Sequence, residues 1–540
     1  MGAGDLPGLA PPPLADPGPP LKRDNGRPGR GESALCERRG DSLPAWLHPT
    51  EAPMSSPART RSWNAAMGAS PGDIDLTIPP GHIEGALPKR LRGGRMLSNG
   101  PGWTRIGDRT AHPFDGHGYV RSFAIQADGS VHLRARFVHT PSYTAERDAQ
   151  KLVHRGFATN VTDRFWDNLG FGPPRNVANT TITRWGDRLL AGWEAGAPHA
   201  LDPTTLDTRG EDHFGGILEG KSTLAHMRKD AIADRLVLCT LAQARQATFT
   251  FHEVDPTGTV VSTATAQIDG MVFAHDYALS PSWFVLGGNP LRMKPWQLVR
   301  TLLGTGTLLT SVATDLRKPG MLHLVPRGGG DLRSVELPGK LFVVHFGNAF
   351  EQDDGTLIVD ACAFADFPFG EEFGYTGPQG AFDPGLPEAR GPQKLVRITV
   401  PAGATTATWE RLTEHGVDFP RFHPDHEGRE TPLLFGATRK DTRYSDPFDS
   451  VIGIDLLDRD RPEDLWTAPD TVFVGEPIFV PDPENGDQGT VLVILSDGAS
   501  ARTTLAVFDA RRLSAGPVAT VPLPLLPIAF HGDWDPEGAS

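Results

Sequence analysis

The sequence predicts an all-β fold, and three observations support this class. Glycine and proline are abundant, with 61 and 50 residues in a chain of 540, as expected for many short strands joined by tight turns. Segments with the apolar spacing of an amphipathic helix are scarce. Runs of strand-like composition recur instead, as at residues 188–194, 247–252 and 394–400, and Asp-Pro or Gly turn signals follow several such runs.

The order of the chain predicts one large domain behind a tail. Residues 1–70 are rich in Pro, Gly, Ala and Arg and lack sustained periodicity, so we expect a disordered tail that buries too little surface to fold. Over residues 71–540, strand, turn and strand recur, which favours a single domain built as a radial array of small sheets. The repeat is too degenerate for the sheets to be counted.

Charge and composition exclude several classes of protein. The formal charge of −14 and the pI near 5.7 argue against a nucleic-acid partner, because phosphate binding requires clustered Lys and Arg. Cys36, Cys239 and Cys362 lie far apart and in no metal-ligand spacing, which favours a reducing compartment. No stretch is long and apolar enough to span a bilayer, so we expect a cytoplasmic protein for which peripheral membrane contact stays open.

Four histidines are the candidate metal ligands. His226, His275, His345 and His531 each lie in or beside an apolar, strand-like run, and a buried imidazole needs a partner. Inward-facing positions of separate sheets can supply one ligand each, so wide spacing in sequence is compatible with one centre. The local zinc patterns of two His four apart or of paired Cys are absent. On residue types alone, each lone His is more often structural or exposed than a ligand.

Seven short segments, taken in their order along the chain, carry a resemblance to a known family. They are Phe-Asp-Gly-His-Gly at 114–118, Ala-His at 225–226, Ala-His-Asp at 274–276, Val-His-Phe-Gly-Asn-Ala-Phe-Glu at 344–351, Asp-Phe-Pro-Arg at 418–421, Gly-Glu-Pro-Ile-Phe-Val at 475–480 and Phe-His-Gly-Asp-Trp at 530–534. From about residue 73 onward the chain resembles the carotenoid cleavage oxygenase family, which includes apocarotenoid-cleaving and stilbene-cleaving enzymes and a retinoid isomerase.

The resemblance implies a seven-bladed β-propeller with a dome of loops and short helices over the metal site. It implies a ferrous ion, Fe(2+), held by His226, His275, His345 and His531, with open positions for dioxygen. Three acids would orient three of these rings, and the matching positions are Glu194, Asp418 and Glu476. The family usually has Glu at the position of Asp418. Because Asp is one methylene shorter, we expect its contact with the ring NH to be longer or bridged by water.

The resemblance also implies oxidative cleavage of a conjugated C=C bond of a carotenoid or apocarotenoid to two carbonyl products. A phenolic stilbene is the alternative substrate, because Tyr119 and Lys151 have roughly the separation of the Tyr and Lys that stilbene-cleaving relatives use. Both residues could equally be structural. A non-cleaving isomerase and a ligand-binding propeller are further alternatives, and oxygen consumption separates cleavage from both.

A long apolar substrate needs an apolar route to the site. Residues 283–286 and 302–304 are candidates for a membrane-facing mouth, and ordinary core positions are the competing interpretation.

Overall fold

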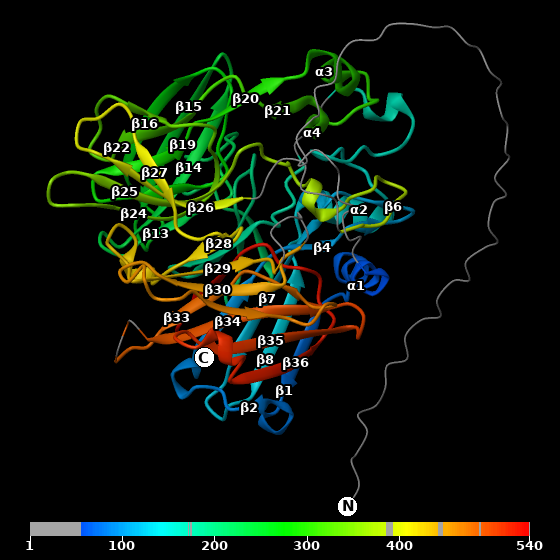
Figure 1. Cartoon of the computed structure of the whole chain (residues 1–540). Coiled ribbons are helices and arrows are strands. Elements are labelled where there is room, and N and C mark those ends of the chain that lie inside the picture. Colours follow the sequence, from blue (N-terminus) through cyan, green and yellow to red (C-terminus); the bar gives the residue numbers. More distant parts are fainter. Residues whose placement is uncertain are drawn as a thin grey trace, which may run out of the picture. The chain divides into compact units, whose positions relative to one another are not determined.

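The fold is all-β, as the sequence predicts (Figure 1). The computed structural model describes residues 56–170, 172, 175–384, 393–440, 447–484, 486 and 488–538. They lie within one compact unit, Pro53–Ser540, while the unit Met1–Ala52 falls outside the described residues. The runs expected at 188–194, 247–252 and 394–400 form or lie largely within strands.

The described residues form seven antiparallel sheets of four or more strands, numbered here in chain order. Sheet 1 has the order β1 (Ile74–Ile78), β8 (Val131–Phe137), β7 (His117–Ile125), β3 (Arg95–Ser98) and β37 (Gly532–Asp535), with β4 (Pro101–Trp103) paired to β7. Sheet 2 contains β12 (Thr208–Glu211), β11 (His199–Leu201), β10 (Arg188–Gly192) and β9 (Thr181–Trp185). Sheet 3 contains β13 (Arg228–Asp230), β14 (Arg235–Gln243), β15 (Gln246–Val254) and β16 (Val260–Asp269).

The other four large sheets follow along the chain. Sheet 4 contains β18 (Tyr277–Leu279), β19 (Trp283–Gly287), β22 (Gly320–Pro326) and β23 (Arg333–Leu337). Sheet 5 contains β24 (Phe342–Glu351), β25 (Leu357–Phe364), β26 (Lys394–Val400) and β27 (Thr408–Arg411), and sheet 6 contains β28 (Asp418–Arg421), β29 (Leu433–Thr438), β30 (Ser450–Asp455) and β31 (Asp464–Thr467). Sheet 7 contains β2 (Glu84–Gly85), β36 (Ala519–Pro524), β35 (Arg502–Asp509), β34 (Gly489–Asp497), β32 (Phe473–Val474) and β33 (Ile478–Pro481).

Two small sheets and a few short helices lie outside this set. The small sheets are β17 (Val272–Phe273), β20 (Asn289–Met293) and β21 (Val312–Thr314), and β5 (Arg105–Ile106) with β6 (Arg109–Thr110). The α-helices are α1 (Pro57–Met67), α2 (Pro141–Ala149), α3 (Pro295–Leu302) and α4 (Leu308–Ser311), which lie to one side of the large sheets in the view of Figure 1. The 3-10 turns are η2 (Pro80–His82), η3 (Lys89–Leu91), η4 (Pro113–Asp115), η5 (Phe165–Asn168), η6 (Glu371–Phe373), η7 (Pro424–His426) and η8 (Leu513–Ala515). Among the described residues, no helix is long and apolar enough to cross a bilayer.

Buried apolar side chains join each large sheet to the next one in chain order. For example, Leu189 of sheet 2 and Val120 of sheet 1 belong to one buried cluster, and Phe251 of sheet 3 stacks on Phe284 of sheet 4. Comparable clusters join sheet 2 to 3, 4 to 5, 5 to 6 and 6 to 7. A further cluster joins sheet 7 back to sheet 1, so the packing contacts form a complete circuit.

Sheet 1 contains strands from both ends of the domain, because β3 (Arg95–Ser98) pairs with β37 (Gly532–Asp535). Arg95 on β3 donates hydrogen bonds from Nε (3.0 Å) and a terminal nitrogen (2.8 Å) to Asp535 on β37. Both side chains are about 95% buried. A buried ion pair of this kind is weak support for stability while intact, but the loss of one partner leaves an uncompensated charge.

The disorder predicted for residues 1–70 is wrong for residues 57–67, which form α1. Its side chains Trp63, Ala66 and Met67 are buried against Phe382, Phe473 and Phe530. The sequence lacks a helical apolar stripe here, and the helix is held instead by contacts with distant parts of the chain. Residues 1–55 lie outside the described residues.

Replacing Asp535 tests the closure between the chain ends. We expect Asp535→Ala to lower the free energy of unfolding by about 3–5 kcal/mol, because Arg95 then stays buried without its partner. Asp148→Ala, which removes the partner of Arg147 in an exposed pair, should cost less than about 1 kcal/mol. Urea unfolding followed by fluorescence measures both free energies of unfolding. Equal losses in the two variants would contradict a special role of the Arg95–Asp535 pair in joining the two ends of the domain.

Candidate metal centre

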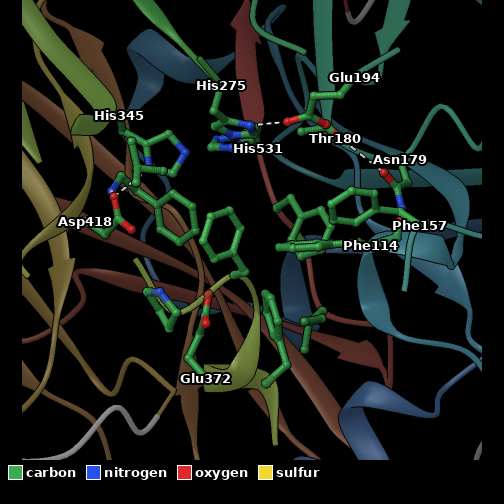
Figure 2. Close-up of a pocket in the computed structure, with 18 of the residues that line it drawn as sticks. Phe114, Phe157, Asn179, Thr180, Glu194, His275, His345, Glu372, Asp418 and His531 are labelled. Carbon is green, nitrogen blue, oxygen red and sulfur yellow. Dashed lines mark hydrogen bonds and ion pairs between the residues drawn. The ribbon is translucent and has the colours of Figure 1, made fainter. Parts of the chain in front are cut away.

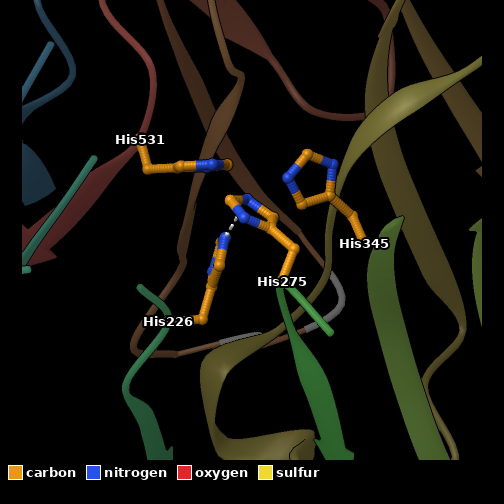
Figure 3. Close-up of side chains that lie close together, drawn as sticks. All are labelled: His226, His275, His345 and His531. Carbon is orange, nitrogen blue, oxygen red and sulfur yellow. Dashed lines mark hydrogen bonds between the residues drawn. The ribbon is translucent and has the colours of Figure 1, made fainter. Parts of the chain in front are cut away.

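The four predicted histidines come together from four different sheets (Figure 3). His226 stands two residues before β13 of sheet 3, and His275 two residues before β18 of sheet 4. His345 lies within β24 of sheet 5, and His531 directly precedes β37 of sheet 1. Because each is at or near a strand that forms one edge of its sheet, the four imidazoles converge on a common point.

The geometry of the cluster suits a single ion. One nitrogen from each ring lies within 4.8 Å of the corresponding nitrogens of the other three. His226 Nε2 is 3.2 Å from His275 Nε2, and His345 Nε2 is buried without a hydrogen-bond partner among the described residues. A buried ring nitrogen without a partner is unfavourable, and a cation between the four rings would satisfy it. Imidazole nitrogen is a good ligand for Fe, Zn, Cu and Ni.

Three carboxylates hold three of these rings, and they come from the three sheets that supply no histidine. Glu194 follows β10 of sheet 2 and accepts a hydrogen bond from His275 Nδ1. Asp418 of β28 accepts from His345 Nδ1 at 2.6 Å, and Glu476 accepts from His531 Nδ1 at 3.0 Å. The first two contacts are drawn in Figure 2. With Nδ1 donating to a carboxylate, the lone pair of Nε2 is left toward the centre of the cluster.

Neighbouring groups keep the carboxylates ionised. Burial alone would raise the pKa of Glu476, but the Arg421 guanidinium and the His531 ring lower it to about 2. Burial also opposes ionisation of Asp418 and Glu194, and His345 and His275 respectively hold the pKa of each below its ordinary value.

Burial and neighbouring charges also set the pKa values of the imidazoles. Burial, with the nearby imidazoles adding to it, holds the pKa of His226 well below its usual range. Burial also lowers the pKa of His531, against the influence of Glu476. For His345, burial lowers the pKa, but the carboxylates of Asp418, Asp276 and Glu476 together more than offset this, so the pKa is raised. A neutral ring is the form that binds a metal, and His226 and His531 are held in it.

The expected lengthening at Asp418 is wrong, because this carboxylate contacts the ring directly. The register of β28 against β29 shifts between Asp418 and Arg421, and Phe419 has a positive φ of 54°. This irregularity alters the course of the strand beside His345, and the shorter side chain reaches the ring. The carboxylate oxygen also accepts from the Phe419 backbone NH at 2.9 Å.

Some residues around the centre were not singled out from the sequence. Arg421 donates two hydrogen bonds to Glu476, at 2.9 and 2.8 Å. Asp276 lies 3.9 Å from His226 Nδ1, beyond hydrogen-bond distance, and it pairs with Arg228 at 2.7 Å. Both Arg421 and Asp276 belong to segments that carried the family resemblance, but no residue pattern indicates their partners.

A large cavity opens onto the cluster (Figure 2). Its volume is about 530 Å³, and His275, His345 and His531 lie in its wall. Aromatic side chains are the largest group in the rest of the wall, and eleven phenylalanines contribute, among them Phe114, Phe157, Phe367, Phe419, Phe473 and Phe530. The ring of Phe419 lies 5.6 Å from that of His345 and 5.2 Å from that of His531. The cavity therefore offers an apolar, π-rich surface beside the imidazoles.

Tyr119 and Lys151, the candidate contacts for a phenolic substrate, are not brought to the site. Tyr119 is fully buried in the packing between sheets 1 and 7, and its hydroxyl donates to the Gly72 carbonyl. Lys151 is exposed, and neither residue lines the cavity. No tyrosine or lysine is among the described residues of the cavity wall.

Comparison with known proteins identifies the class to which this fold and site belong. A family model described as retinal pigment epithelial membrane protein matches residues 70–536. The chain belongs to this family, the carotenoid cleavage oxygenases, and it is an enzyme of that family.

Individual relatives are similar over nearly their whole length. Apocarotenoid-15,15'-oxygenase from Synechocystis sp. is 32% identical, with 90% of this chain and 98% of the relative covered. Lignostilbene-alpha,beta-dioxygenase isozyme III from Sphingomonas paucimobilis is 27% identical, with 86% and 92% covered. The structure of the cobalt-substituted Synechocystis apocarotenoid oxygenase superposes with a TM-score of 0.80 at 32% identity, covering 87% of this chain and 98% of that one.

The low pKa of Glu476 predicts a specific dependence of stability on pH. A folded-state pKa of about 2, against an ordinary value of 4.5, means a stabilisation that is complete above pH 4.5 and is lost as the pH falls toward 2. The shift corresponds to about 3 kcal/mol. We expect Glu476→Gln to lose this acid-range dependence in unfolding measured from pH 6 to 2. If the free energy of unfolding depends on pH in the same way in wild type and variant, Glu476 is not the group responsible.

Proposed function

We propose that this enzyme is a non-haem Fe(2+) dioxygenase that cleaves one conjugated C=C bond of an apocarotenoid or carotenoid to two carbonyl products. The observation that carries the proposal is the position of the four-imidazole cluster at the wall of a large, phenylalanine-lined cavity. The similarity to apocarotenoid-15,15'-oxygenase supports this substrate class.

We further propose that the seven large sheets are the blades of a β-propeller, with the metal on its axis. The circuit of packing from sheet 1 through sheet 7 and back supports this arrangement. So does the distribution of site residues, because four sheets each contribute one histidine and the remaining three each contribute one carboxylate.

His226, His275, His345 and His531 would hold the iron through Nε2. Glu194, Asp418 and Glu476 would fix the ring orientations and offset the charge that four neutral ligands leave on the ion. The ferrous ion, when bound, supplies the redox chemistry needed to activate dioxygen. Cleavage adds one oxygen atom of dioxygen to each carbon of the double bond, so the C=C bond breaks, two C=O bonds form, and no other reductant is required.

The protein's own part in the reaction is to bind and place the polyene. The aromatic wall excludes water and stacks against a conjugated chain, and Phe419 covers the side of the cavity next to His345 and His531. No proton transfer is needed for the overall reaction. The proposal therefore requires no general acid or base beside the cluster.

An apolar polyene fits this cavity better than a phenolic stilbene does. A phenol needs a hydrogen-bond partner when it is buried, and Tyr119 and Lys151, the two residues expected to supply one, do not line the cavity. Other polar side chains of the wall, such as Asn179, Thr180 and Glu372, would have to supply it instead. The similarity to lignostilbene-alpha,beta-dioxygenase keeps the stilbene as the substrate to test in competition. An isomerase or a binding protein would not consume oxygen.

Metal content and oxygen uptake test the proposal directly. We expect about one iron per chain in the wild type, and in His345→Ala a loss of iron together with a fall of oxygen uptake by at least about a hundredfold. His426→Ala, in the loop at η7, should retain both. An apocarotenal and a stilbene are supplied in turn and together, and products are identified by mass.

Iron-free wild-type protein without oxygen uptake would refute the dioxygenase. Uptake with the stilbene alone would move the assignment to the alternative substrate.

We also propose that the enzyme contacts a membrane surface to collect its substrate. Seven exposed apolar side chains on and beside η5 and α3 form what we call the apolar patch: Phe165, Trp166, Leu169, Trp296, Val299, Leu302 and Leu303. Arg155, which lines the cavity, donates to the carbonyls of Asn168 and Thr301 and so ties both parts of the patch to the cavity wall. Of the two candidate segments, Leu302 and Leu303 are exposed, whereas β19 at 283–286 is mostly buried.

Charge introduced into the apolar patch should weaken membrane binding. Trp166 and Trp296 are 57% and 71% exposed, and we expect the double variant Trp166→Glu/Trp296→Glu to bind liposomes at least about tenfold more weakly. Leu457→Glu, at another exposed leucine, serves as the control. Oxygen uptake with detergent-solubilised substrate should be unchanged in both, and retained liposome binding by the double variant would exclude the patch as the contact surface.

A further inference from the structure

Helix α1 forms part of the cavity wall although it precedes the residues that the family model matches. The match begins at residue 70, and α1 ends at Met67. Trp63 lies in the middle of this helix, is 5% exposed and lines the cavity. A helix from outside the matched region therefore supplies a large aromatic side chain to the proposed substrate space.

Trp63 is held in one orientation by a hydrogen bond and by ring contacts. Its Nε1 donates to the Phe373 carbonyl at 3.1 Å, and its ring meets that of Phe473 edge-on at 4.9 Å. Phe373 packs in turn on Phe530, at 5.7 Å between ring centroids. Because Phe530 directly precedes His531, these contacts connect Trp63 to the side of the cavity that carries one of the four imidazoles.

Polar contacts attach α1 to loops far along the chain. Arg59 is buried and donates to the carbonyls of Asp470 (2.8 Å) and Pro447 (3.1 Å). Ser62 Oγ donates to the Thr471 carbonyl at 2.6 Å. Pro447 lines the cavity, and Asp470 and Thr471 lie just before Phe473, which also lines it. The helix thus bridges the segments that shape this wall, and an eleven-residue helix depends on such contacts for its stability.

We propose that α1 is a substrate-selecting element in which Trp63 narrows the cavity, so that a polyene chain fits beside it and a bulky cyclic end group does not. This inference rests on the proposed cleavage of apocarotenoids. The indole fills volume between Phe373 and Phe473, and its fixed orientation leaves little room for adjustment. The hydrogen bond and ring contact of Trp63 go to Phe373 and Phe473, not to the imidazoles or their carboxylates. Trp63 would therefore affect which substrate shapes fit the cavity and not the metal site.

The test compares two apocarotenals of equal polyene length, one with a cyclic and one with an open-chain end group. In full-length Trp63→Ala, we expect the ratio of kcat/KM for the cyclic over the open-chain substrate to rise by about tenfold or more, since steric discrimination of this kind spans about 10–200-fold. Trp63→Phe keeps an aromatic wall and should shift the ratio less. Iron content should equal that of the wild type.

Trp409→Ala is the matched control, because the Trp409 Nε1 also donates to a carbonyl, that of Pro338 at 2.8 Å, but its ring lies outside the cavity wall. This control should leave the ratio unchanged. An unchanged ratio in Trp63→Ala, or an equal shift in Trp409→Ala, would overturn the inference.

Anaerobic titration of the iron-loaded variants with both apocarotenals separates this inference from the proposed function. Binding preference should shift in Trp63→Ala even where no turnover occurs. If the wild type takes up no oxygen with either compound, the proposed cleavage fails. If binding preference is the same in Trp63→Ala and wild type, the selecting role of α1 fails.

Discussion

The structure of the site depends on hydrogen bonds between carboxylates and imidazoles that belong to different sheets. Each of the hydrogen bonds that Glu194, Asp418 and Glu476 accept joins two different sheets. A ring held at Nδ1 can turn only one nitrogen inward, so these contacts fix both the orientation and the tautomer of His275, His345 and His531. The cluster forms because the fold brings together edge strands of sheets 1, 3, 4 and 5, which carry the four histidines.

The cavity adds a second constraint, because a largely apolar space must border ionised carboxylates and polar imidazoles. The two requirements are met by separation: the carboxylates that hold the rings are paired with those rings or with Arg421, and eleven phenylalanines line other parts of the cavity. Phe419 lies at the boundary, since its neighbour Asp418 holds His345 while its own ring faces that imidazole and His531. The positive φ of Phe419 lets the Asp418 side chain reach the His345 ring while the Phe419 side chain faces the cavity.

Distant segments complete the domain. β37 from the C-terminal end closes sheet 1, and α1 from before the family-matched region closes part of the cavity. Both are attached by buried arginines, Arg95 to a carboxylate and Arg59 mainly to backbone carbonyls. The apolar patch is likewise tied to the cavity wall through Arg155. Buried guanidinium groups suit this role because one planar group can satisfy several acceptors.

The sequence by itself determined the all-β class, many of the strands and, through its resemblance to the family, which four histidines and three carboxylates to expect at the site. These features depend on local composition and short motifs, which can be recognised in the sequence without knowing which residues are close in space. Only the tertiary structure decided that Asp418 reaches His345 without a bridge, that Tyr119 packs in the core, and that Trp63 lines the cavity. Such outcomes depend on a strand irregularity and on packing between residues hundreds of positions apart, for which no local pattern exists.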